Sequence, residues 1–212
     1  MHVDIWSDVA CPWCYVGTQR FGRAVAETGV DVDVVYRSFE LDPRVPVGGD
    51  SPLLVDYLSQ KFGDRSRVQA AHARLTSAGV ELGIDFRWEG MRRANTFDAH
   101  RLLAWALHDH GADKQRLLHA YFTDGLDVAD HGVLATLAGD VGLDTVGAGS
   151  LLASDAETDF VHAEREEAYG DGITAVPTFV IEGEWMLQGA HETEKWVKAL
   201  THIDAELESR RA

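Results

Sequence analysis

Positive charge and long hydrophobic runs are both scarce in this sequence of 212 residues. Lysine and arginine total 19 against 35 aspartate and glutamate residues, which gives a formal net charge of −16. Because binding to phosphates requires clustered cations, this balance disfavours nucleic acids and anionic membranes as partners. No apolar run approaches the roughly 20 residues that a membrane-spanning helix needs. We therefore expect neither a nucleic-acid partner nor a membrane partner.

Cysteine is also scarce, because the chain has only Cys11 and Cys14, in a C-x-x-C arrangement. Two cysteines cannot form a disulfide framework, and in a reducing compartment such a pair is typical of catalysis or metal binding. Asp4 and Asp8 lie where a secretory signal peptide would have a basic start and an apolar centre. The sequence therefore predicts a cytoplasmic protein.

Zinc binding is the first alternative for the cysteine pair. A structural zinc site needs four ligands, usually two C-x-x-C pairs or one pair with two spaced histidines. The nearest histidine pair, His108 and His110, lies in a predicted helix where that spacing points the two rings apart. We therefore expect no metal site. A second alternative is that both cysteines are small buried core residues.

Two β-strands and a helix open the chain. Residues 2–6 and 30–41 alternate apolar and polar side chains, which is typical of strands. Between them, residues 11–28 carry apolar side chains at helical spacing, and Gly29 ends that helix. A strand, a helix and a strand in so short a segment predict a βαβ unit with two parallel strands.

The middle of the chain is predicted to be helical. Three of the five prolines lie in residues 42–52, which predicts a loop and a domain boundary. Apolar faces at helical spacing then follow one another up to about residue 169. The predicted helices are residues 52–62, 67–82, 95–111, 114–126, 132–143 and 155–170.

Strand character returns near the C-terminus. Residues 177–189 contain two short apolar runs that flank Glu182-Gly183-Glu184, which predicts a β-hairpin. Residues 191–211 predict a final amphipathic helix. Its apolar face carries Trp196, Leu200, Ile203 and Leu207.

These elements predict an α/β fold in which a sheet-building unit is interrupted by a large all-helical insertion. Residues 1–50 and 172–212 would form the sheet-building domain, and residues 51–171 would form the helical subdomain. The interruption places the cysteine pair and the C-terminal strands far apart in the chain but in one domain.

Disulfide chemistry is the third interpretation of the cysteine pair. A thiolate is the attacking group in disulfide exchange, and its supply is set by the thiol pKa. Cys11 lies where the helix begins, so unpaired amides and the helix dipole favour an anion there. Pro12 suits the first helical position because its missing N–H is not needed. We expect Cys11 to be the exposed attacking thiol and Cys14, about one turn further on, to be the buried resolving thiol.

Several motifs together resemble a known family. The segment "CPWC", opening a helix after an N-terminal strand, resembles the thioredoxin superfamily. The helical insertion followed by "GITAVPTFVIEG" is similar to the DsbA-type branch, which has a thioredoxin-like fold interrupted by helices. The segments "SDVACPWCYVG" and "NTFDAHRL" resemble the FrnE-like cytoplasmic subfamily of that branch.

This resemblance implies a role for Pro177. In the superfamily, the proline that opens the strand after the insertion has a cis peptide bond and faces the redox cysteines, whereas an ordinary strand proline is trans. The sequence matches at Val176-Pro177-Thr178-Phe179. A cis bond there would expose the Val176 backbone for pairing with an extended substrate peptide, and it would block a metal from bridging the cysteines.

The resemblance also implies an activity. It is that of a thiol–disulfide oxidoreductase or isomerase, with no bound cofactor beyond the redox-active Cys11–Cys14 disulfide. The implied partners are peptide or small-molecule thiols and disulfides. Trp13 supplies an apolar surface and no charge, so the motif fixes neither the reduction potential nor the direction of exchange. The physiological substrate and the oligomeric state are equally open.

Two other functions remain as alternatives. Some relatives carry serine at the first cysteine and use glutathione as isomerases or transferases; Cys11 argues for disulfide chemistry, with glutathione as a possible co-substrate. Asn95 and Thr96 resemble a segment that lines the cleft of those relatives, although either residue can also cap a helix. The segment Gly189-Ala190-His191 departs from the expected G-A-Q. The non-enzymatic alternative is a peptide-binding module with idle cysteines.

Disulfide exchange also requires a proton acceptor for Cys14. Asp8, three residues before Cys11, and Glu40, near the end of the second strand, are the candidate carboxylates. Each is equally an ordinary solvated carboxylate in its own sequence context.

Overall fold

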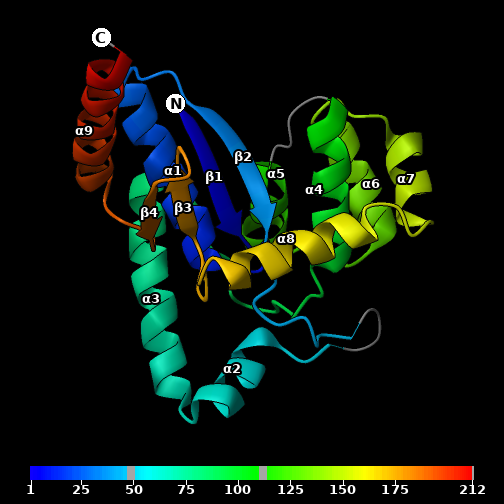
Figure 1. Cartoon of the computed structure of the whole chain (residues 1–212). Coiled ribbons are helices and arrows are strands. Elements are labelled where there is room, and N and C mark those ends of the chain that lie inside the picture. The colour runs from blue at the N-terminus through cyan, green and yellow to red at the C-terminus, as the bar shows by residue number, and fades with distance from the viewer. Residues whose placement is uncertain (47–50, 110–113, 212) are drawn as a thin grey trace.

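The computed structural model describes residues 1–46, 51–109 and 114–211, which surround a four-stranded sheet (Figure 1). The strands run in the order β2-β1-β3-β4. β1 pairs with β2 in parallel and with β3 in antiparallel, and β3 pairs with β4 in antiparallel. Their bounds are His2–Ser7 for β1, Asp33–Ser38 for β2, Thr178–Ile181 for β3 and Trp185–Gln188 for β4.

The predicted βαβ unit is confirmed, with a shorter second strand than expected. α1 spans Pro12–Thr28 and ends at Gly29, whose φ of 67° places it in the left-handed region that glycine tolerates. β2 ends at Ser38 rather than at residue 41. The reason is that the Leu41 amide donates to the Asp8 carboxylate, at 2.7 Å, instead of continuing the sheet.

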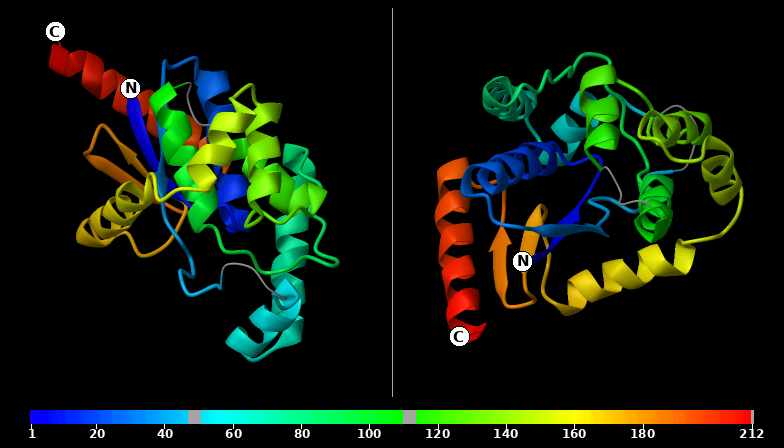
Figure 2. Two further views of the ribbon diagram at one scale, coloured as in Figure 1. Left: turned by 90° about the vertical axis from the view of Figure 1, so that its right-hand side faces the viewer. Right: turned by 90° about the horizontal axis from the view of Figure 1, so that it is seen from above.

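One face of the sheet is covered by α1 and by α9, Thr193–Arg211, which lie side by side (Figures 1 and 2). The predicted apolar face of the last helix is confirmed, since three of its four residues are buried and Leu207 packs at the edge. The buried side chains between sheet and helices are Val3, Ile5, Phe21, Ala24, Phe179, Ile181, Trp196, Leu200 and Ile203.

The opposite face of the sheet is covered by α8, Thr158–Gly170 (Figure 2). A smaller buried cluster joins them, made of Trp6, Phe39, Ala168 and Ile173. The sheet therefore forms the middle layer of three.

The predicted C-terminal hairpin is confirmed. Glu182 and Gly183 both have positive φ, 51° and 69°, and the Glu184 amide donates to the Ile181 carbonyl at 3.0 Å. Positive φ at both central residues is the geometry that suits the twist of two-stranded hairpins.

The insertion between β2 and β3 contains seven α-helices in its described residues. They are α2, Leu54–Phe62; α3, Arg65–Leu82; α4, Phe97–Asp109; α5, Lys114–His119; α6, His131–Asp140; α7, Thr145–Leu152; and α8. Residues 47–50 of the predicted loop, and residues 110 and 111 at the end of the predicted helix 95–111, lie outside the described residues, and His110 of the histidine pair is one of them.

Two features of the insertion differ from the prediction. The sequence-based prediction lacks α7, because Gly147 and Gly149 weaken the helical signal there. In the structure α7 begins after Asp144, whose carboxylate accepts from the Val146 amide at 3.0 Å. The predicted helix 114–126 is instead α5 followed by a π-helical turn, Ala120–Asp124, that ends at Gly125.

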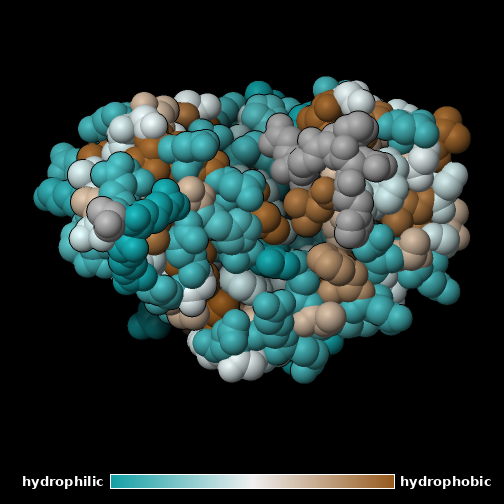
Figure 3. Space-filling model, turned by 45° about the horizontal axis from the view of Figure 1, so that its top comes forward, coloured by the Kyte–Doolittle hydropathy of each residue, from teal (hydrophilic) through white to brown (hydrophobic). Residues whose placement is uncertain are grey.

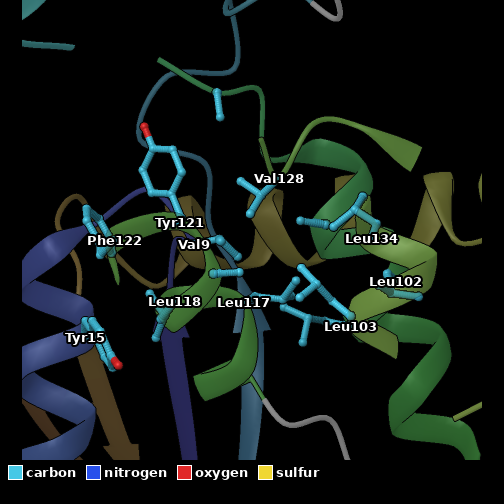
Figure 4. Packing of buried hydrophobic residues seen from close by; sticks show 14 of the residues in the cluster. Val9, Tyr15, Leu102, Leu103, Leu117, Leu118, Tyr121, Phe122, Val128 and Leu134 are labelled. Atoms are coloured by element: carbon cyan, nitrogen blue, oxygen red, sulfur yellow. The ribbon is translucent and has the colours of Figure 1, made fainter. Parts of the chain in front are cut away.

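The insertion shares a hydrophobic core with the beginning of α1. Figure 4 shows Tyr15 of α1 and Val9 among side chains of α4, α5 and α6. The rings of Tyr15 and Phe122 are stacked, with centroids 6.3 Å apart. The cluster therefore joins the insertion to the strand–helix junction that carries the cysteines. The division into a sheet-building domain, residues 1–50 plus 172–212, and a helical subdomain, residues 51–171, stays a prediction.

The surface agrees with the composition. The face in Figure 3 is mostly hydrophilic, with hydrophobic residues in small patches. Within the described ranges, no helix is long and apolar enough to cross a membrane.

Candidate active site

The cysteine pair lies at the N-terminus of α1, at the edge of the sheet where β1 ends. Cys11 is the N-cap residue, with extended φ and ψ of −99° and 108°, and Pro12 takes the first helical turn as predicted. The Cys14 amide donates to the Cys11 sulfur at 3.2 Å. An amide pointing at the sulfur stabilises a thiolate on Cys11.

Both cysteines are buried, so the predicted exposure of Cys11 is wrong. Cys11 is 4% exposed and Cys14 is fully buried. The reason is that the Val176 segment covers the Cys11 sulfur, which lies 3.7 Å from the Val176 carbonyl oxygen. Cys11 nevertheless lines an open groove, and Cys14 does not. Of the two thiols, Cys11 is therefore the one that is accessible from that groove.

The Val176–Pro177 peptide bond is cis, which confirms the predicted cis bond at Pro177. α1 approaches this proline closely at Gly17. A Cβ atom at residue 17 would lie 2.9 Å from the Pro177 Cγ and 3.3 Å from Ala190. Only glycine therefore allows α1 and the proline segment to pack at this distance.

A groove of about 550 Å³ runs from Cys11 between the strand–helix junction and helices α2 and α3. Its walls are mainly apolar. Leu41, Trp13 and Phe62 stand at its rim, and they are 47%, 40% and 59% exposed. The remaining apolar lining is Ala10, Pro12, Leu54, Leu58, Val68, Ala71, Leu75, Trp88 and Val176.

Trp13 also borders a second, more polar cleft of about 600 Å³. Arg20 lines this cleft, where it donates to the Ala190 carbonyl at 2.9 Å and pairs with Glu192 at 2.7 Å. Arg74 of α3 also lines the cleft. Trp13 therefore separates an apolar groove from a charged cleft.

Asp8 is buried just behind the cysteines. Its carboxylate accepts from the amides of Ala10 and Leu41, at 3.1 and 2.7 Å, and its carbonyl accepts from the Cys11 amide. Burial alone would raise the pKa of Asp8, but His100 and these two amides outweigh it and lower the pKa. Asp8 is thus an ionised carboxylate that holds the β1–α1 loop, which makes it a weak proton acceptor.

Glu40 has the opposite character. It is 5% exposed, and Arg165 of α8 donates to its carboxylate at 3.4 Å. Burial, together with the charge of Asp8, raises the pKa of Glu40. Of the two predicted carboxylates, Glu40 is therefore the one that gains a proton more readily. Its role for Cys14 stays a prediction.

Asn95 and Thr96 lie at the start of α4. The Asn95 side chain accepts from the Phe97 amide at 2.9 Å and donates to the Val45 carbonyl at 2.5 Å. Asn95 therefore caps the helix and holds the loop after β2. Thr96 is buried beside Asp8 in a small pocket next to the groove. Contact between substrate and either residue stays a prediction.

Two buried groups beneath the cysteines, His100 and Lys114, are absent from the sequence-based prediction. His100 has no hydrogen-bond partner on either ring nitrogen within the described residues, and its Nε2 lies 3.6 Å from the Asp8 carboxylate. Lys114 donates to the Ser7 carbonyl at 2.6 Å. His100 lies in the "NTFDAHR" segment, so that motif carried a signal, whereas a lysine at a helix start normally indicates a solvated position.

Burial shifts the pKa values of both His100 and Cys14. Burial lowers the pKa of His100, and the charge of Lys114 adds to this, so the imidazole is neutral. Burial raises the pKa of Cys14 well above its ordinary value, and the neighbouring Cys11 adds to it. The charge of Lys114 acts in the opposite direction on Cys14. The Cys14 thiol therefore depends on its surroundings to ionise.

Among the residues that the structure describes, no three histidine, cysteine, aspartate or glutamate side chains come together in a way that could hold a metal ion.

This chain is similar to proteins of one family of thioredoxin-like domains. The profile of the DSBA-like thioredoxin domain family matches residues 2–201. The uncharacterised protein YwbO of Bacillus subtilis is 29% identical over 213 residues, which cover 95% of this chain and 96% of YwbO. A probable DsbA oxidoreductase from Streptomyces coelicolor, known as a crystal structure, is 37% identical with a TM-score of 0.90, covering 97% of this chain and 91% of that one.

A more distant solved structure carries a small thiol. The cytosolic disulfide reductase DsbM from Pseudomonas aeruginosa, solved with GSH, is 19% identical with a TM-score of 0.65, covering 99% of this chain and 98% of that one. At this identity the match concerns the fold. Together with the closer matches, it confirms the expected mixed α/β fold, a thioredoxin-like sheet domain with a helical insertion.

Proposed function

Because this chain belongs to the DSBA-like thioredoxin domain family, we propose that it catalyses thiol–disulfide exchange through a reversible disulfide between Cys11 and Cys14. The observation that carries the proposal is the position of Cys11. Its sulfur lies at a helix N-terminus, receives the Cys14 amide and faces the Val176 carbonyl at the end of an open groove. This arrangement favours a thiolate where a substrate disulfide can reach it.

The proposed reaction has two steps. The Cys11 thiolate attacks one sulfur of a substrate disulfide, the other substrate sulfur leaves as a thiolate, and a mixed disulfide forms. Cys14 then loses its proton and attacks the Cys11 sulfur, which releases the second substrate thiolate. The substrate gains two electrons, the pair is oxidised, and the protons balance through solvent. The reverse sequence oxidises a substrate dithiol, and no other cofactor is required.

The groove supports a peptide as the substrate. Its apolar lining would bury an apolar side chain next to the reacting cysteine, at about 25 cal/mol for each Å² removed from water. The Val176 backbone at its end lies where an extended peptide could pair with it. Small-molecule thiols and disulfides would use Cys11 without the rest of the groove.

Insulin reduction tests this proposal. The wild-type protein should accelerate the reduction of insulin by dithiothreitol, and Cys11→Ser should fall to the uncatalysed rate because the attacking sulfur is gone. Undiminished acceleration by Cys11→Ser would overturn the exchange mechanism. Absence of acceleration by the wild-type protein would favour the alternative of a peptide-binding module with idle cysteines.

A glutathione-dependent isomerase or transferase is the second candidate. The charged cleft beside Trp13, with Arg20 and Arg74, favours it, because a small peptide with two carboxylates could bind arginine there. Binding of GSH by DsbM is consistent with this alternative. Retention on a glutathione column that survives both Cys11→Ser and Cys14→Ser would support it over exchange.

We also propose that the chain belongs to the FrnE-like subfamily. The segments "SDVACPWCYVG", which contains both cysteines, and "NTFDAHRL", which leads into α4, support this placement. The cytoplasmic location stays a prediction. A redox titration of the Cys11–Cys14 pair would place the protein as reductant, isomerase or oxidant.

A further inference from the structure

A lysine from the insertion lies beneath the redox pair. Lys114, the first residue of α5, is fully buried although lysine is almost never buried without a partner. Its ammonium donates to the Ser7 carbonyl at 2.6 Å. Ser7 is the last residue of β1, so the cation reaches from the helical insertion to the edge of the sheet that carries the cysteines.

The contact falls on a peptide group that also faces Cys14. The carbonyl of Ser7 and the amide of Asp8 belong to the same peptide unit, and a hydrogen bond from that amide lowers the pKa of the Cys14 thiol. A cation on the carbonyl oxygen polarises the peptide and makes its N–H a stronger donor. Lys114 therefore acts on Cys14 both by its charge and through this peptide group.

Resting on the proposed exchange function, we propose that Lys114 is a positioning residue that stabilises the Cys14 thiolate through the Ser7–Asp8 peptide. When Cys14 attacks the mixed disulfide, negative charge is present on a sulfur that water does not reach. When a substrate thiolate attacks the Cys11–Cys14 disulfide, the same charge appears on Cys14 as the leaving group. The lysine assists both directions of exchange.

The other charged groups around Lys114 leave it protonated near neutral pH. Burial lowers the pKa of Lys114 to about 8, against the opposing effect of the surrounding anions. The buried imidazole of His100 is neutral, and the Tyr36 ring lies 5.9 Å from the ammonium. The anionic or ionisable groups that act on it are Cys14 on α1, Cys11 at the N-cap of α1, Asp8 after β1 and Glu164 on α8.

A stopped-flow reaction with dithiobis(nitrobenzoate) separates the two cysteines. The reduced protein should release nitrothiobenzoate in two phases: Cys11 attacks the reagent and releases one equivalent, then Cys14 attacks Cys11 and releases the second. In each phase one S–S bond forms, one breaks, and the thiolate leaves. Only the second phase depends on Cys14, and its rate is independent of reagent concentration.

Lys114→Met and Lys114→Gln should both slow the second phase about tenfold, close to the effect of raising the Cys14 pKa by about one unit. A glutamine can keep a hydrogen bond to the Ser7 carbonyl but carries no charge. Lys114→Gln therefore separates the effect of the charge from the effect of the hydrogen bond at the end of β1. The ratio of wild-type to variant rates should be largest below about pH 8 and should shrink above it, as Lys114 loses its proton.

Arg101→Met is the matched control. Arg101 is also a buried cation of the insertion, but it pairs with Asp98 and donates to the carbonyls of Leu151, Ser154 and Ala156, away from the thiols. Arg101→Met should leave the rate of the second phase within about twofold of wild type, which is less than the effect of one pKa unit.

Lys114→Met should remain folded, because the buried charge of Lys114 itself opposes folding below about pH 8.

Three results would overturn the inference: a normal second phase in Lys114→Gln, an equal slowing in Arg101→Met, or a rate ratio that is constant with pH. Failure of the exchange function itself is distinguishable from these. In that case the wild-type protein would show no second phase at any pH.

Discussion

Gly17 sets the distance between α1 and the cis proline, and through it the position of Cys11 beneath Val176. Gly17→Ala would place a methyl group 2.9 Å from the Pro177 Cγ, with Ala190 on the other side. We expect a loss of about 1–3 kcal/mol in unfolding free energy, although alanine is the better helix former. Urea unfolding measures this loss, and slower insulin reduction should accompany it.

Gly22→Ala is the matched control for this substitution. Gly22 lies in the same helix, is exposed, and a Cβ there would meet nothing within 4 Å. It should therefore stabilise the protein by up to about 1 kcal/mol. If Gly17→Ala were as stable as Gly22→Ala, the close approach of α1 to Pro177 would not constrain the site.

At the scale of elements, α2 and α3 form an arm that extends from the rest of the molecule (Figure 1). Side chains of this arm make one wall of the groove. Phe62, the last residue of α2, is 59% exposed in that wall. Phe62→Ser should raise KM about fivefold for a peptide disulfide that carries leucine beside cysteine, since part of a phenylalanine surface is lost to binding. With a small disulfide such as hydroxyethyl disulfide, the rate should not change.

Val80→Ser provides the comparison on the same arm. Val80 lies on α3, is 72% exposed and is not part of the groove. Phenylalanine and valine have similar helix propensities, so replacing either by serine should change the free energy of unfolding by a similar small amount. An equal rise in KM in both variants, or a slower reaction of Phe62→Ser with the small disulfide, would show that Phe62 does not act by binding the peptide.

Local signals predicted some elements well. Pro12 and Gly29 fix both ends of α1, and the hairpin follows from Glu182-Gly183-Glu184, because these residues act within a few positions of the chain. α7 and the π-helical turn at Ala120–Asp124 depend instead on packing against neighbouring helices. Such tertiary contacts override propensity, so a single sequence does not show them.

At the scale of the whole molecule, the site is assembled from segments far apart in the chain. Resemblance to a family, rather than periodicity, predicted that Pro177 would face Cys11. The contact of Lys114 with the Ser7 carbonyl depends on how the insertion packs onto the sheet domain. Lys114 has no local pattern that marks this contact, so only the folded structure reveals it.

The shared core explains why the insertion matters to the chemistry. Val9 and Tyr15, on either side of the cysteine motif, are buried with the insertion's helices (Figure 4). Helices α2 and α3 give the groove its wall, and α5 provides the buried cation. The helical segment therefore supplies both a wall of the groove and part of the electrostatic environment of the thiols.

The most direct test of the account is to trap the mixed disulfide. Cys14→Ser removes the resolving thiol, so incubation with a peptide disulfide should leave one peptide attached at Cys11, visible by intact mass and released by dithiothreitol. The wild-type protein should not accumulate this adduct, because Cys14 resolves it. The account is contradicted if Cys14→Ser forms no adduct, or if Cys11→Ser forms as much adduct through Cys14.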